Sequence, residues 1–292
     1  MRKLAPQRLS KRRFVLTTTV DGLWVLQILT GIETLAPELG LRSIRPSVET
    51  REAALAHKVA ADLRRAGVID EAGNVDAHVV EWLTVLSRRD IALLISVRTP
   101  DNGTALTGAL LGRFAEWWVI MERSEDLIRI GGAGTSTAEG AANAVIRAQI
   151  ERLCGIHEPA PLRPVTLDVD AMKEKATSRQ ALDVFLASQR LDPDQLQILK
   201  MAADADRSAQ AGIVAIQSGL ALAGPTRAHV EQSAVTVIDT PEGRIVAEHE
   251  PHGGKKWMIL APGTTSNITA AVNRMMRRLP ANDEWFSYRK VV

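Results

Sequence analysis

The chain repeats one order of elements in its two halves, and this doubling limits what it can fold into. Near the start, Phe14–Asp21 (FVLTTTVD) predicts a strand that ends in an aspartate and passes directly into a helix. Near the middle, Val165–Asp170 (VTLDVD) predicts the same pair of elements. Each half then runs through helices and strands to a Gly-Thr-Ser turn before a last helix, at Gly134–Thr137 and Gly263–Ser266. A chain built from two similar halves is interpreted as a scaffold that presents a surface for binding.

The expected boundaries follow from this doubling. Residues 1–13 form a basic tail, 14–155 and 165–292 form the two halves of one compact unit, and 156–164, with three prolines, is the linker. The tail carries six positive charges and no acid, and we expect a disordered terminus. Threonines and Asp21 interrupt the apolar run after it, so no signal peptide is expected.

Composition excludes several classes of protein. The 292 residues are 46% hydrophobic and 24% charged, which is typical of a globular protein with a sizeable core. The net charge of +2 argues against a nucleic-acid binder, and no apolar run is long enough for membrane insertion. The single cysteine, Cys154, fits a reducing compartment and is expected to be a buried structural thiol on a helix.

Hydrophobic periodicity predicts the elements of each half. Short apolar runs joined by tight turns indicate an antiparallel meander, so the predicted class is α+β with a central antiparallel sheet and two helical bundles. The first half is predicted to contain a helix over Leu23–Leu29 capped by Asp21, a helix over Val48–Ala66, a helix after Asp76, strands over Ile91–Val97, Phe114–Glu122 and Leu127–Ile130, and a helix over Ala138–Leu153. The second half is predicted to contain helices over Ala171–Arg190 and Pro193–Ala203, strands over Ala211–Gln217, Ser233–Ile238, Arg244–Glu250 and Lys256–Leu260, and a helix over Asn267–Leu279.

Two stretches carry a weak indication of ligand chemistry. Gly131–Gly134 lies between a predicted strand and helix, where backbone amides can bind an anion, but the third glycine of a dinucleotide fingerprint is Thr137. We expect a structural strand-to-helix turn. Glu248–His252 brings two histidines and two carboxylates together without the further ligands of a closed metal site, and we expect a solvated hairpin loop.

The sequence contains no catalytic constellation, so we predict neither an enzyme nor a site for a cofactor or metal. The remaining candidates for function are surface segments that could bind a partner. The segment Thr99–Gly112 is long for a hairpin loop and combines three glycines with Leu106, Leu110 and Leu111. These leucines either bind a partner or fold back on the protein's own sheet, and both alternatives stay open. Trp117 and Trp118 are adjacent on a predicted strand, so one must pack into the core and the other lie on the opposite face.

Several segments together resemble a known family. Val20–Gln27 (VDGLWVLQ), Ala66–Asp76 (AGVIDEAGNVD), Val237–Val246 (VIDTPEGRIV), Leu260–Leu279 (LAPGTTSNITAAVNRMMRRL) and Asp283–Val292 (DEWFSYRKVV) are similar to the EspG family of mycobacterial type VII (ESX) secretion-associated proteins. The similarity covers nearly the whole chain after the basic tail and is strongest to the member of the second ESX system. The tail itself departs from the family's pattern.

The resemblance implies a cytoplasmic chaperone. It implies that the protein binds PE–PPE heterodimers of its own ESX system at the PPE helical tip, keeps them soluble until they reach the secretion machinery and its AAA ATPase, and folds as a pseudo-two-fold repeat. It also implies contacts from the loop between the second and third strands and from the C-terminal helical bundle. Carried to this sequence, the expected partner-binding residues are Arg98, Leu106, Leu110, Leu111, Arg113, Gln195, Gln197, Ile198 and Met201. Arg98 and Arg113, at the loop's edges, are expected to set the charge preference for the partner.

Two other functions are kept as alternatives. One is an anion- or nucleotide-responsive protein that uses Gly131–Thr135 at a helix start. The other is a self-associating structural protein, such as a homodimer that pairs through an exposed sheet edge or loop.

Overall fold

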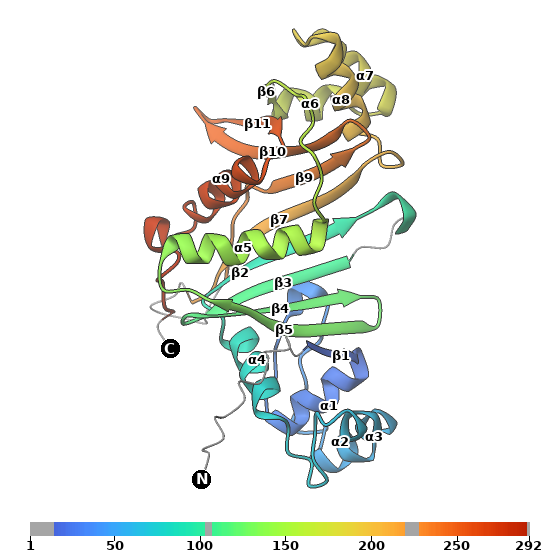
Figure 1. Cartoon of the computed structure of the whole chain (residues 1–292), viewed down its shortest axis with the longest axis vertical. Coiled ribbons are helices and arrows are strands. Elements are labelled where there is room, and N and C mark those ends of the chain that lie inside the picture. Colours follow the sequence, from blue (N-terminus) through green and yellow to red (C-terminus); the bar gives the residue numbers. More distant parts are fainter. Residues whose placement is uncertain (1–14, 103–106, 220–227, 291–292) are drawn as a thin grey trace, which may run out of the picture.

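A computed structural model describes residues 15–102, 107–219 and 228–290 (Figure 1). The tail predicted for residues 1–13 lies outside this part of the chain. The strands are β1 (Val15–Thr19), β2 (Ile91–Arg98), β3 (Thr107–Phe114), β4 (Trp117–Ser124), β5 (Leu127–Thr135), β6 (Val165–Asp168), β7 (Ala209–Gln217), β8 (His229–Val230), β9 (Val235–Thr240), β10 (Gly243–His252) and β11 (Lys255–Pro262). The α-helices are α1 (Val20–Thr30), α2 (Arg51–Ala56), α3 (Lys58–Arg65), α4 (Ala77–Arg88), α5 (Glu139–Cys154), α6 (Val169–Lys175), α7 (Arg179–Ser188), α8 (Pro193–Ala202) and α9 (Thr265–Met276). None of these helices is long and apolar enough to cross a bilayer.

The strands form one antiparallel sheet. Its order is β1-β5-β4-β3-β2-β7-β9-β10-β11-β6, and β8 pairs with β7 outside this path. The two halves of the chain meet at the centre, where β2 pairs with β7 from Ile91 opposite Gln217 to Arg98 opposite Gln210. The predicted α+β class with a large antiparallel sheet is therefore confirmed.

Side chains on the two faces of the sheet enter different cores. Alternate residues of β2 divide between them: Ile91 and Leu93 pack under α5 and α9, whereas Ala92 joins the core beneath α1–α4. In the second half, Ile245 and Ala247 of β10 face a third core, which is closed by α7 and α8. In Figure 1, α1–α4 gather at the bottom, α6–α8 at the top, and α5 and α9 lie across the sheet between them.

Three helix predictions are corrected. Helix α1 begins at Val20, because the Thr19 hydroxyl, not Asp21, caps it by accepting a hydrogen bond from Gly22 N at 3.2 Å. The helix predicted over Val48–Ala66 is divided at His57, whose extended backbone ends α2 and begins α3. The helix predicted over Ala171–Arg190 is divided into α6 and α7, since Ser178 caps a new start by accepting from Ala181 N at 3.1 Å.

Both stretches considered for ligand chemistry lie inside strands. Gly131–Gly134 belongs to β5, where Gly131 and Gly132 pair with Ile120 and Val119, and α5 begins only at Glu139. The expected strand-to-helix turn is wrong, and with it the placement of an anion-binding turn there. Glu248–His252 belongs to β10 and is not a hairpin loop. The Glu248 carboxylate is buried and accepts hydrogen bonds from Arg274 and Arg278.

The segment after α9 returns to the first half of the chain. The backbone N of Lys290 donates to the Asp90 carboxylate at 3.0 Å, and Arg113 Nη2 donates to the carbonyls of Trp285 and Tyr288 at 3.1 and 2.8 Å. We call Trp285–Lys290 the C-terminal clasp. It closes the end of the sheet at which β2 begins.

Candidate partner-binding face

The end of β2 is tied to the turn that follows α8 in the second half of the chain. Arg98, the last residue of β2, donates to the carbonyl of Ala205 at 2.7 Å through Nη1 and to that of Ser208 at 3.2 Å through Nη2. Ala205 and Ser208 belong to the turn between α8 and β7. The start of the β2–β3 connection and the end of the bundle therefore lie side by side, although they come from different halves.

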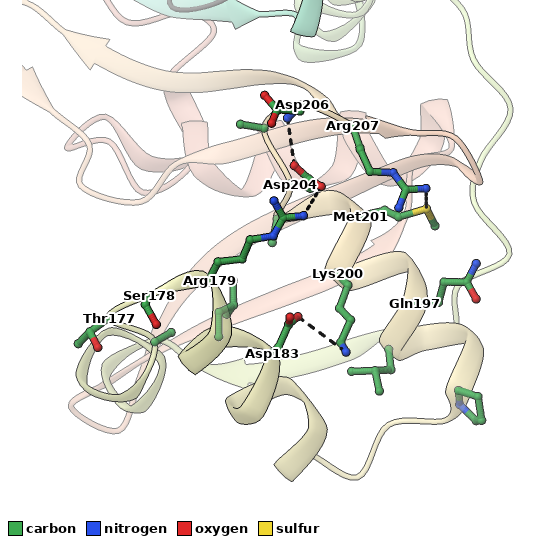
Figure 2. A pocket seen from close by; sticks show the side chains of 16 residues that line it. Thr177, Ser178, Arg179, Asp183, Gln197, Lys200, Met201, Asp204, Asp206 and Arg207 are labelled. Atoms are coloured by element: carbon green, nitrogen blue, oxygen red, sulfur yellow. Dashed lines mark hydrogen bonds and ion pairs between the residues drawn. The ribbon is translucent and has the colours of Figure 1, made fainter.

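A groove lies between α7 and α8 beside this contact. Its volume is about 840 Å³. Its lining comes from three segments of the chain: Ala176–Arg179 with Leu182 and Asp183; Pro193, Leu196, Gln197, Lys200 and Met201; and Ala203–Arg207. We call it the bundle groove. Figure 2 shows it from close by. Leu182, Leu196 and Met201 supply apolar wall, and charged side chains of both signs surround them.

Ion pairs balance most of the charge in the bundle groove. Arg179 binds the carboxylate of Asp204, and Lys200 Nζ lies 3.8 Å from Asp183 Oδ1 (Figure 2). The Asp204 side chain is nearly buried and also accepts a hydrogen bond from Asp206 N at 3.1 Å. The Lys200–Asp183 pair is exposed on both sides and contributes little stability, about 0–1 kcal/mol.

A strip of the sheet between helices α1–α4 and helices α6–α8 is only partly covered. Leu94 pairs with Val214, Ser96 with Gly212, and Gly212 in turn with Thr236. Directly paired residues point to one face of a sheet, so these five side-chain positions form a continuous strip. All five are half-buried, and a Cβ placed on Gly212 would have no neighbour within 4 Å. We call this the open strip.

The predicted contacts on α8 divide by exposure. Gln197 is exposed and lines the bundle groove. Gln195 instead serves the start of its own helix, in a reciprocal capping box with Asp192. Ile198 and Met201 are each 3% exposed, so the expectation of free contact side chains is corrected for both. They pack in the core beneath α7 and α8, where helical spacing directs one side of α8 inward.

The leucines expected on an exposed loop lie elsewhere. Leu110 and Leu111 are fully buried on β3, where they pair with Leu94 and Leu93. Of the two alternatives, packing in the protein's own sheet holds for both, and the exposed loop is wrong. Leu106 lies outside the described residues. Arg113 was expected at a loop edge facing a partner, but it is fully buried on β3 and holds the C-terminal clasp. Arg98 directs its guanidinium to backbone carbonyls rather than outward, so its visible role is to position the α8–β7 turn.

Two further predictions concern single side chains. Trp118 is 1% exposed and donates to Ser136 Oγ at 2.7 Å, whereas Trp117 is 54% exposed, which confirms that the pair divides between the two faces.

Cys154 is half-buried at the end of α5, and burial raises the pKa of its thiol to about 11. Between residues 15 and 290, leaving aside the undescribed gaps, no three His, Cys, Asp or Glu side chains gather as metal ligands.

Sequence reasoning missed the charged wall of the bundle groove. Arg179, Lys200, Asp204 and Arg207 lie on three separate segments that only the fold brings together. Asp204–Arg207 (DADR) follows α8 and precedes β7, and a short charged run of this kind is usual for a surface turn. No spacing rule in the sequence marks these residues as neighbours of Arg98.

Comparison with known proteins agrees with this architecture. The sequence profile of the EspG family matches residues 19–274. The chain is 50% identical over 278 residues to the ESX-2 secretion-associated protein EspG2 of Mycobacterium tuberculosis, covering 95% of this chain and 100% of that protein. It is 26% identical over 270 residues to the ESX-1 secretion-associated protein EspG1 of Mycobacterium marinum, covering 90% and 88%.

A chaperone complex is among the solved structures that share the fold. It is the Mycobacterium tuberculosis type VII secretion system chaperone EspG5 in complex with a PE25–PPE41 dimer. The match has a TM-score of 0.72 at 20% sequence identity, and it covers 92% of this chain and 98% of that one. The profile match and the full-length identity lead to one conclusion: the chain belongs to the EspG family.

Proposed function

We propose that this protein is a secretion chaperone that binds a PE–PPE heterodimer of its own ESX system at the PPE helical tip. In this role it keeps the pair soluble and directs it to the secretion machinery. The observation that carries the proposal is the 50% identity, over the full length of the relative, to a protein named for association with ESX-2 secretion. The fold shared with EspG5, whose structure includes a PE25–PPE41 dimer, supports the kind of client.

The binding face in this proposal consists of the open strip and the bundle groove. Arg98 holds them next to each other through its bonds to Ala205 and Ser208. The open strip offers backbone and small side chains on which an apolar helix tip can lie closely, and the bundle groove adds polar contacts around its rim. Covering apolar surface supplies the binding energy, at about 25 cal/mol for each Å² removed from water, before ordering costs.

We further infer that the two halves are related by a pseudo-two-fold axis between β2 and β7. Outward from that pair, the order β2, β3, β4, β5, β1 in the first half corresponds to β7, β9, β10, β11, β6 in the second. Helix α5 follows β5 as α9 follows β11. An experimental structure tests this: the halves should superpose with β2 on β7, and a best superposition that pairs other strands would contradict the repeat.

The test of function is co-expression with candidate clients. The tagged chain is expressed with the PE–PPE pair encoded nearest its gene, captured, and passed over a size-exclusion column. A stable complex of one chain with one heterodimer is expected. Capture only of a pair from another ESX locus would change the client and keep the function, whereas failure to capture any such pair would remove the proposal.

A further inference from the structure

One cationic side chain of the bundle groove has no carboxylate partner among the residues that the structure describes. Six charged residues line the groove, and four of them form the pairs Arg179–Asp204 and Lys200–Asp183. The other two, Asp206 and Arg207, are exposed and form no ion pair with any residue that the structure describes. They are neighbours in sequence but do not neutralise each other.

Arg207 directs its guanidinium toward the groove. Its Nη2 donates to the sulfur of Met201 at 3.4 Å, and Figure 2 shows the side chain extending to that sulfur, with Asp206 on the other side of the Asp204 carboxylate. A thioether is a weak acceptor, and a guanidinium has five N–H donors in a planar fork. The contact therefore orients Arg207 over the wall of the groove and leaves most of its donors available.

Gln197 supplies a second available donor nearby. It precedes Met201 by four residues on α8, so the two lie on the same side of the helix. Gln197 is exposed, and its amide makes no hydrogen bond within the described ranges. Arg207 and Gln197 thus present a fork of donors and an amide on either side of the Met201 sulfur, and neither side chain is bound to a groove carboxylate within the described residues.

We propose, resting on the function proposed above, that Arg207 is the residue that selects the client by charge. Together with Gln197 it receives an acidic side chain of the client's helix beside the apolar wall of the groove. A carboxylate accepts two parallel hydrogen bonds from the guanidinium fork. A neutral acceptor forms weaker hydrogen bonds with it and is selected less strictly by their geometry. Of the other two cations, Arg179 is bound to the nearly buried Asp204, and Lys200, which lies 3.8 Å from Asp183, lacks the planar fork of donors.

The test compares two charge reversals on the full chain. Arg207→Glu changes the groove, whereas Arg190→Glu makes the same change of charge at an exposed arginine between α7 and α8 that does not line it. Binding of the PE–PPE pair encoded nearest this gene is measured by titration at low and high salt. We expect Arg207→Ala to weaken binding about tenfold, Arg207→Glu to weaken it further, and both to reduce its salt dependence, with Arg190→Glu unchanged. Arg207→Lys, which keeps the charge and loses the fork, should fall between wild type and Arg207→Ala.

Each other outcome is decisive. If Arg207→Glu binds with wild-type affinity and salt dependence while its melting temperature is unchanged, the inference is wrong and the proposed function stands. Equal losses from Arg207→Glu and Arg190→Glu mean that overall charge acts instead of this contact, and they overturn the inference as well. If the wild-type chain captures no PE–PPE pair, the proposed function fails and the inference fails with it.

Discussion

Asp90 and Lys290 lie 200 residues apart in the chain, yet the Asp90 carboxylate accepts a hydrogen bond from the Lys290 backbone at 3.0 Å. The other oxygen of Asp90 accepts from Ala115 N at 3.0 Å. Arg113, next to this carboxylate, completes the attachment of the C-terminal clasp. Two buried groups of opposite charge from the first half therefore fix the C-terminal clasp of the second. Burial lowers the pKa of Arg113 to about 10, so the guanidinium remains charged at neutral pH.

Replacement of Arg113 by Met should therefore destabilise the whole protein. It takes a buried positive charge from near Asp90, whose remaining cation is Arg289 at 3.9 Å, and the two clasp carbonyls lose their donor, at a cost of about 3–5 kcal/mol. Urea denaturation measures this loss. The control is Arg129→Met, an exposed arginine on β5, which should change stability by no more than about 0.5 kcal/mol. Equal stability of the two variants would show that the clasp does not connect the halves.

Leu110→Asp should unfold the protein instead of only blocking a partner. The side chain is fully buried between β2 and β4, and a carboxylate there has no partner, so we expect a loss above about 4 kcal/mol. Circular dichroism and thermal melting report the result. Leu127→Asp, at a leucine that is 46% exposed, makes the same change of charge and should leave the melting temperature nearly unaltered. A folded Leu110→Asp variant that melts like wild type would contradict the position of β3.

Arg98→Ala should loosen the α8–β7 turn more than it lowers global stability. It removes two hydrogen bonds from a charged donor to backbone carbonyls, at a cost of about 1–2 kcal/mol for this partly exposed side chain. Hydrogen exchange should become faster at residues 203–208. Arg190→Ala serves as the control and should leave these amides as slow as in wild type. Unchanged exchange in Arg98→Ala would mean that another contact holds the turn.

Glu49 should make the free energy of unfolding depend on pH in the acid range. The Arg42 side chain, the Arg45 backbone and Trp24 donate hydrogen bonds to its carboxylate and lower its pKa from 4.5 to about 2. A lowered pKa in the folded state stabilises the protein above pH 4.5, and this contribution is lost as pH falls toward 2. Glu49→Gln should therefore be less stable than wild type at pH 6, and the difference should shrink at pH 3. A difference that stays constant across this range would contradict the lowered pKa.

The sequence predicted correctly those elements that are determined by residues close together in the chain. Asp192, Pro193 and Gln195 encode a capping box within four residues, and α8 begins there as predicted. The pattern of apolar residues predicted the bounds of β7, β9, β10 and β11 to within a few residues. The division of Trp117 and Trp118 between faces followed from strand geometry alone.

Predictions failed where a distant contact decides the structure. His57 divides the predicted helix while its ring packs edge-on against Trp24, 33 positions earlier, with the ring centroids 5.6 Å apart. Gly108 and Gly112 are two of the three glycines in the segment expected to form a long loop, but both lie on β3. A Cβ at Gly108 would come within 2.9 Å of Leu39, so this glycine permits close packing and not flexibility. The charged residues of the bundle groove converge only through the tertiary fold.

Hydrogen exchange of the chain with and without its PE–PPE client tests the central claim most directly. If the open strip and the bundle groove bind the client, amides near Ser96, Gly212 and Gln197–Arg207 should become protected in the complex. Helices α5 and α9, on the opposite face of the sheet, should exchange as they do in the free chain. Protection that falls on α5 and α9, with none at the bundle groove, would contradict the account.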